Sequence, residues 1–150
     1  PAYPKSALDL NLGAKVLVQI KVGENGEVLE AHPYQVSLSH PVRSERTETR
    51  VRKHFEVASV NAIKQWRFEP LSLNAQVKRE STLLVPIHFS TQQMGNQKWS
   101  SFIPGPVSPA PWAKNDIVPN PQDIDRLKEG DTQLMDSPFK LINNPSSKQS

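Results

Sequence analysis

The sequence predicts an α+β fold in which three antiparallel strands carry two helices on one face. Residues 15–22 alternate apolar and polar side chains, which indicates a strand, and Asn25-Gly26 follows as a strong hairpin signal. Residues 51–66 repeat apolar side chains at helical spacing, and residues 77–90 extend again with apolar side chains at alternate positions. About 90 residues can bury a core of this kind, although with little margin.

The first helix is expected over residues 3–12. Pro4 suits a first helical position, and Gly13 is expected to end the helix. The apolar face of the first strand consists of Val16, Val18, Ile20 and Val22. The returning strand, residues 27–36, contains Pro33, which predicts an edge position or a bulge because proline has no N–H to donate.

Residues 37–50 are polar and include a proline, so they are predicted to form a loop. The helix that follows has an apolar stripe of Val51, Phe55, Ala58, Ala62 and Trp66. Pro70 pushes the residue before it out of the helical region, so an extended segment is expected after Trp66. Trp66 and Phe68 are expected in the core. Arg67 is interpreted as structural, capping carbonyls or pairing with Glu69 or Asp9, with a partner contact as the alternative.

The chain divides after Thr91 into a domain, residues 1–91, and an extension, residues 92–150. The extension holds 8 of the 14 prolines, so most of it is expected to be irregular. One short helix is predicted near residues 121–129, where a proline follows a capping asparagine and a glycine ends the pattern. Apolar residues predict that the extension is partly docked on the domain: Trp99, Phe102, Trp112, Phe139, Leu141 and Ile142. The last residues, 143–150, are expected to be disordered.

The charge balance gives little support to a nucleic-acid partner. The formal net charge is +3, and five basic residues cluster at Arg43, Arg46, Arg50, Arg52 and Lys53. Because Glu45 and Glu48 interleave them, the cluster is interpreted as a solvated loop and helix start, with a polyanion site as the less favoured alternative. No cysteine is present, which excludes a disulfide scaffold and thiol chemistry. No run approaches the ~18 apolar residues of a membrane span. The chain starts at Pro1, so we expect any anchor or signal peptide to lie upstream.

No pattern in the sequence nominates a catalytic residue, a metal ligand or a cofactor site. The four histidines lack metal-ligand spacing, no glycine-rich phosphate loop is present, and no nucleophile and base have local support. A hydrolytic enzyme remains the third hypothesis and would need a cleft with a perturbed acid or base. We therefore expect a protein without catalytic activity.

Five short motifs occur together in order along the first 90 residues. They are Tyr3-Pro4 with Ala7; Gly13 before the first strand; Asn25-Gly26 at the hairpin; Phe55-Glu56, Ala58 and Ala62 leading into Trp66-Arg67-Phe68-Glu69-Pro70; and the strand Val85-Pro86-Ile87-His88-Phe89. With these motifs, residues 3–90 resemble the C-terminal domain of TonB-family energy transducers. The chain departs from that family in its longer charged loop at 37–50, in lacking most of the segment ahead of Tyr3, and in its 59-residue extension.

The resemblance implies a mechanical role rather than a catalytic one. TonB-like proteins reach across the periplasm from the inner membrane, take energy from a proton-motive motor complex and pull on outer-membrane receptors that import siderophores and similar ligands. The receptor's N-terminal box peptide adds as a strand beside the last strand of the domain. The partner-binding residues that this implies are Lys78, Arg79, Glu80, Ser81, Thr82, Leu83, Leu84, Val85, Pro86, Ile87 and His88. Tyr3-Pro4 is expected either to pack in the domain or to contact the partner.

A second hypothesis keeps the fold but removes the transduction. In it the protein is an envelope interaction module similar to the TolA C-terminal domain, and the extension occupies the sheet edge or binds another partner. An unprotected edge strand also invites pairing between copies, so a homodimer is a further expectation.

Overall fold

The computed structural model describes residues 2–70, 80–91, 101–113, 133–134 and 139–143. The predicted turn at 71–76, residues Lys78 and Arg79, Trp99, the predicted helix at 121–129 and residues 144–150 lie outside the described residues. The elements are α1 (Lys5–Asp9), β1 (Ala14–Gly23), β2 (Val28–Leu38), α2 (Glu45–Ile63), β3 (Arg67–Pro70), β4 (Glu80–Phe89), β5 (Ile103–Pro104), η3 (Pro111–Ala113), β6 (Gln133–Leu134) and β7 (Phe139–Asn143).

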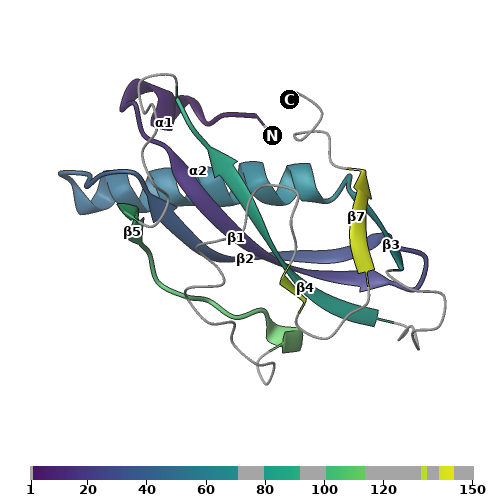
Figure 1. The fold of residues 1–150 in the computed structure, drawn as a ribbon. Helices are drawn as coiled ribbons and strands as arrows, with labels where there is room; N and C mark the ends of the chain where they lie inside the picture. The colour runs from purple at the N-terminus through teal and green to yellow at the C-terminus, as the bar shows by residue number, and fades with distance from the viewer. Residues whose placement is uncertain (1, 71–79, 92–100, 114–132, 135–138, 144–150) are drawn as a thin grey trace.

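The predicted α+β class is confirmed, but the sheet has more strands than the three predicted. The main sheet has the order β5-β2-β1-β4-β6, and β3 pairs with β7 in a separate two-stranded sheet. The three expected strands form its centre, with antiparallel pairing of β1 to β2 and to β4. The additional strands β5, β6 and β7 all come from the extension (Figure 1). Each of them pairs with a strand of the first 91 residues.

The first helix is shorter than predicted and does not end at Gly13. Asn11 has a positive φ of 51°, and its N–H donates to the Leu8 carbonyl at 3.0 Å. The Leu12 N–H donates to the Ala7 carbonyl at 2.9 Å, which completes a Schellman motif. Asparagine tolerates the left-handed conformation better than most residues, so Asn11 takes the role that was assigned to Gly13.

The hairpin between β1 and β2 forms where Asn25-Gly26 predicts it. The Gly26 N–H donates to the Gly23 carbonyl at 3.0 Å, and the Gly23 N–H donates to the Glu27 carbonyl at 2.9 Å. Gly26 has a φ of +85°, whereas Asn25 has no positive φ. This pattern is a type I turn closed by a glycine bulge, in which only the glycine needs the left-handed conformation.

Pro33 marks a bulge in β2, as the sequence predicts. The pairing register shifts between Leu17, which lies opposite Gln35, and Val18, which lies opposite Pro33. Tyr34 is therefore the extra residue on β2. A second shift occurs beside the hairpin, between Lys21 and Val22. The strand continues to Leu38, two residues beyond the predicted end.

The second helix begins earlier than predicted, so the loop expected over 37–50 is confirmed only over residues 39–44, between the end of β2 and the start of α2. Ser44 caps the helix by accepting a hydrogen bond from the Thr47 N–H at 3.3 Å. Glu45 and Glu48 lie in the first turn, where carboxylates are favoured by the helix dipole. Of the predicted stripe, Val51, Phe55 and Trp66 are buried and Ala58 is partly buried against the core. Ile63, beside this stripe, is buried as well, and so is Ser59, which was not predicted.

The segment after α2 forms the predicted corner. The Trp66 N–H donates to the Ile63 carbonyl at 2.9 Å, and the Phe68 N–H donates to the Gly26 carbonyl of the hairpin at 2.8 Å. Trp66 and Phe68 are each 1% exposed, while Arg67 is exposed and forms a backbone bridge with Glu27. The corner is therefore held against the tip of the first hairpin.

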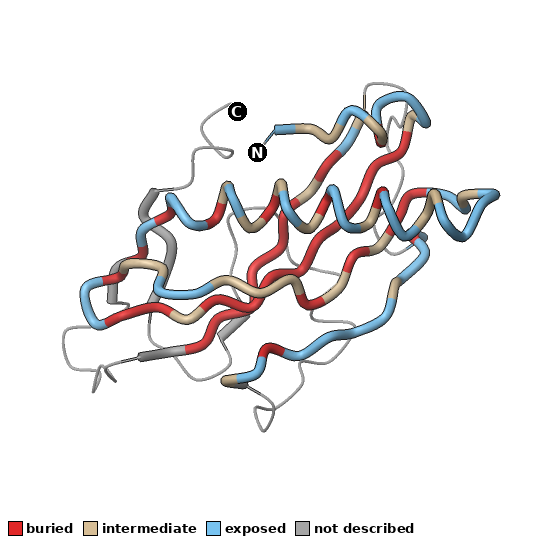
Figure 2. Tube along the Cα trace, turned by 180° about the vertical axis from the view of Figure 1, so that it is seen from behind, coloured by how far each residue is buried: buried red, intermediate tan, exposed pale blue. Residues whose placement is uncertain are grey.

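The main core lies between one face of the sheet and the two helices. Figure 2 shows α2 in front of this face, with its buried positions turned toward the strands. The cluster joins Ala7 and Leu12 near α1, Val51 and Phe55 of α2, the even-numbered apolar residues of β1 from Val16 to Val22, and Leu83, Val85, Ile87 and Phe89 of β4. Both helices pack on one face, as the sequence predicts.

We expect Gly26→Ala to destabilise the protein by about 1–3 kcal/mol. A methyl group at this position would overlap the Phe68 carbonyl, and the alanine would have to keep the positive φ of the glycine. Urea unfolding measures the effect, with the exposed neighbour substitution Glu24→Ala as the control. Equal stability of the two variants would contradict this account of the turn.

Candidate functional site

The strand β4 has buried side chains on both of its faces. Leu83, Val85 and Ile87 are fully buried against the helices, and Phe89 is 2% exposed. On the opposite face, Leu84 is fully buried and Thr82 is 5% exposed. The side chains of β4 are therefore committed to packing, so a partner at this strand would meet mainly its backbone.

The hydrogen-bonding direction of β4 follows from the strand beside it. The Ser39 N–H donates to the Gly13 carbonyl at 2.9 Å, and Gly23 donates to Glu27 at the other end of β1. Because main-chain groups alternate in direction along a strand, the odd-numbered residues of β1 face β2 and the even-numbered residues face β4. Val18 pairs with Val85 and Val16 with Ile87. The odd-numbered residues of β4 therefore bond to β1, and the even-numbered ones face outward.

The outward edge of β4 is only partly covered. The strand β6 pairs at Leu83 and Leu84, and no other strand that the structure describes lies beside residues 85–89 on that side. Pro86 faces outward by the alternation above, so the ladder with β1 loses no hydrogen bond to it. Its carbonyl, and the main-chain groups of His88, are directed away from β1.

Tyr3 and Pro4 are built into the domain. The Tyr3 hydroxyl donates to the Leu12 carbonyl at 2.6 Å, and its ring packs edge-on against Phe55 and Phe89, with ring centroids 6.0 and 5.5 Å away. Pro4 is the N-cap residue of α1, and its carbonyl accepts from the Ala7 N–H. Of the two roles expected for this motif, packing is observed. Tyr3 also contacts the end of β4, because Phe89 belongs to that strand.

Residues 103–108 of the extension run along the free edge of β2 (Figure 1). Beyond β5, the Gly105 N–H donates to the Val36 carbonyl at 2.9 Å and the Ser108 N–H donates to the Tyr34 carbonyl at 2.8 Å. The side chain of Arg52 donates to the same Val36 carbonyl. A Cβ at Gly105 would collide with both groups, so glycine permits the close approach.

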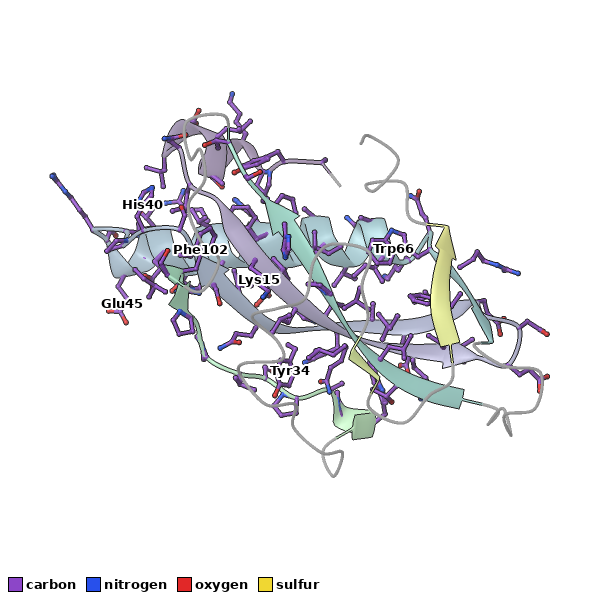
Figure 3. The ribbon with its side chains drawn as sticks, in the orientation of Figure 1. Lys15, Tyr34, His40, Glu45, Trp66 and Phe102 are labelled. Atoms are coloured by element: carbon purple, nitrogen blue, oxygen red, sulfur yellow. The ribbon has the colours of Figure 1, made fainter. Side chains whose placement is uncertain are left out.

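The extension then crosses the second face of the sheet. The Ala110 N–H donates to the Gln19 side chain at 2.6 Å, and the ammonium of Lys21 lies 5.4 Å from the centre of the Trp112 ring. Phe102 is 5% exposed and Ala110 is fully buried. Tyr34 of β2 points toward this segment (Figure 3) and joins Leu17 and Leu84 in a second apolar cluster. Residues 101–113 therefore complete the domain on the face that the helices leave open.

Within the described residues, no group of three or more histidine, aspartate or glutamate side chains is placed to hold a metal ion. No helix in the same residues is both long and apolar enough to cross a membrane. No protein-family model, curated protein or solved structure matches the chain.

The role of Gln19 was not evident from the sequence, because a polar residue at an odd position of β1 is typical of a solvated face. The outward direction of Pro86 has a detectable signal. Proline has no N–H to donate, which disfavours a position that bonds to a neighbouring strand of the sheet. Which side of β4 Pro86 faces still depends on the strand register, which the sequence does not supply.

We expect the protein to lose stability through Tyr3 as the pH rises above 10. Burial raises the pKa of Tyr3 to about 12 from the ordinary value of 10.0. Between these values the unfolded chain releases the proton while the folded chain keeps it, so unfolding is favoured as pH increases. Urea unfolding at pH 9 and pH 11 should show a larger loss for the wild type than for Tyr3→Phe. Tyr34, whose pKa is also raised by burial, is present in both proteins and cancels. A Tyr3→Phe protein with the same alkaline loss would contradict the prediction.

We expect Gln19→Met to destabilise the protein by about 1–3 kcal/mol, because the buried N–H of Ala110 loses its acceptor. Methionine keeps the length of the side chain, so lost packing contributes little. Urea unfolding measures the change, and Gln65→Met at an exposed position is the matched control. A loss no greater than that of the control would show that this contact does not hold the extension.

Proposed function

We propose that the chain is a periplasmic TonB-like domain that binds the N-terminal box peptide of outer-membrane TonB-dependent receptors by strand addition on β4. The proposal includes a link to an inner-membrane proton-motive motor through residues upstream of Pro1. The observation that carries it is the edge of β4, where residues 85–89 have β1 on one side and no described strand on the other. An edge of this kind is a template for another extended chain.

The order of the elements supports the same proposal. A helix, a hairpin, a second helix, an extended corner and a last strand follow one another, and both helices cover one face. Two of the motifs that carry the TonB resemblance pack in the core, and one of them lies at the end of β4. Tyr3 packs against Phe89 at the end of β4, and Trp66 and Phe68 are buried at the corner.

The edge offers few hydrogen bonds, which sets the expected affinity. Between residues 85 and 89 the outward groups are the Pro86 carbonyl and the N–H and C=O of His88. Each backbone hydrogen bond contributes about 1 kcal/mol net, so the few that an edge of five residues can form offset only part of the cost of ordering a peptide. Binding should therefore be modest unless the peptide also displaces β6 and gains the outward groups of Leu84. A second copy of the chain could pair with the same edge.

A non-transducing envelope module is the second candidate, and the pairing of β6 with β4 favours it. Gln133 and Leu134 occupy the edge opposite Leu84 and Leu83, as a permanent cover would. Because Leu84 faces outward, its pair with Gln133 is the hydrogen-bonded one. The variant Gln133→Pro removes one backbone hydrogen bond between these two residues, because proline has no N–H. If the tail only competes, this variant should bind the receptor peptide more tightly. If β6 is a permanent cover, the unaltered chain should not bind the peptide at all.

A cysteine scan tests strand addition directly, since the chain has no native cysteine. Single cysteines at His88 and Ser90 should form disulfides with a cysteine-bearing synthetic peptide that carries a receptor's N-terminal box. Cysteines at Val57 and Asn61, exposed positions on the helix layer, serve as controls. Pairing confined to the control positions would refute the proposal.

We expect Pro86→Ala to tighten binding of the same peptide by about fivefold, because it adds an outward N–H worth about 1 kcal/mol. Pro33→Ala is the matched control, since Pro33 interrupts β2, which lies on the other side of β1 from β4. Isothermal titration calorimetry measures both. An equal gain in the two variants, or none in Pro86→Ala, would contradict pairing at this edge.

A further inference from the structure

The helix α2 carries a row of basic side chains along its exposed face. Arg46, Arg50 and Lys53 are all exposed, and their spacing of four and three residues places them on one side of the helix. We call these three residues the cationic stripe. It runs for about 10 Å, at 1.5 Å per residue. The helix forms the outermost layer of the molecule on this side (Figure 2).

The acidic residues of α2 lie off the stripe. Glu48 pairs with Arg52 at 3.7 Å, on the side nearer the sheet, and Glu45 sits at the first turn (Figure 3). Glu56 reaches Lys53 at 3.8 Å, but the Lys53 side chain remains 69% exposed. The glutamates that interleave the basic residues in the sequence therefore do not interleave them on the surface.

Arg46 and Arg50 repel each other across one helical turn, and no described acidic side chain pairs with either. Together with Thr49, Lys53 and His54 they line a shallow hollow of about 800 Å³. Guanidinium groups arranged in this way are suited to phosphate, which accepts two parallel hydrogen bonds from one arginine.

Apolar side chains are exposed beside the stripe. Leu8 is 51% exposed, Leu10 is 40% exposed and Val57 is 47% exposed. A hydrogen bond of 2.7 Å between Ser6 and His54 holds α1 against α2. Leu10 also lines a small apolar pocket of about 420 Å³ together with Arg43 and Thr47 at the start of α2. Exposed leucines next to basic side chains are typical of helices that lie on a membrane surface.

We propose that the helix layer binds the surface of an anionic lipid bilayer. The cationic stripe contacts lipid phosphates, and Leu8 and Leu10 enter the interfacial region. A soluble polyanion would be attracted by the arginines but would gain nothing from the leucines. The helix layer lies on the opposite face of the sheet from residues 101–113, and its binding to lipid holds or fails independently of strand addition on β4.

Sedimentation with phospholipid vesicles tests the proposal on the full chain. The protein should bind vesicles that contain phosphatidylglycerol, should not bind pure phosphatidylcholine, and should dissociate as salt is raised. Arg46→Gln and Arg50→Gln should each weaken binding by about fivefold, and the double variant by about 30-fold. Glutamine is nearly as good a helix former as arginine, so α2 should stay folded. Arg67→Gln, an equal charge change at an exposed residue of β3, should have little effect.

The remaining outcomes overturn the proposal. An equal loss in Arg67→Gln would mean that only net charge matters. Release from vesicles by inorganic phosphate or glycerol phosphate at low concentration would indicate a site for a free phosphate. Binding of duplex DNA or polyglutamate with the same sensitivity to Arg46→Gln, and vesicle binding unchanged by Leu8→Ser, would indicate a soluble polyanion as the partner.

Discussion

The structure depends on the double burial of its central strand. β1 has a neighbour on each side and is buried on both faces, with Val16, Val18 and Ile20 in the core under the helices. On the other face Leu17 packs with Tyr34 and Leu84, and Gln19 is hydrogen-bonded to the extension. A strand in this position needs two covers, because its peptide groups and apolar side chains must both be removed from water. The helices supply one cover, and residues 101–113 supply the other.

The second cover explains why polar side chains are buried in β1. Gln19 is 1% exposed and accepts from the backbone of the extension, while Lys15 is 4% exposed. A buried amide of this kind is stable only when it is hydrogen-bonded, so it makes the position of the extension specific. This face is therefore less apolar than the face under the helices, and its contacts depend more on hydrogen-bond geometry than on buried apolar area. The boundary that we predicted after Thr91 divides the sequence by composition, but the packing of the described residues continues across it.

Much of the central fold could be predicted from periodicity, and the failures have physical causes. β1 and β4 were predicted because their apolar side chains alternate, β2 because Asn25-Gly26 signals a hairpin, and the corner at Trp66 because Pro70 cannot continue a helix. The start of α2 was missed, since its first six residues are charged or threonine and none of them is buried, which removes the apolar stripe that predicts a helix. The cover over Gln19 was missed because the polar side chains on that face of β1 indicated a surface open to water. At the candidate site, the strand and its apolar face were predicted, whereas the direction of Pro86 and the cover at Leu84 required the register and the long-range pairing with β6.

The two ladders of β1 differ in continuity, and this makes the domain mechanically uneven. β1 pairs with β4 through ten successive residues without a bulge, from Ala14 opposite Phe89 to Gly23 opposite Glu80. The ladder with β2 is interrupted twice, at Leu17 and at Lys21. Tension applied along β4 is shared by all the hydrogen bonds of an unbroken ladder at once, so that ladder should rupture late. The interrupted ladder concentrates strain at its two gaps and should yield first, which would let β1 and β4 travel together as one unit while the hairpin opens behind them.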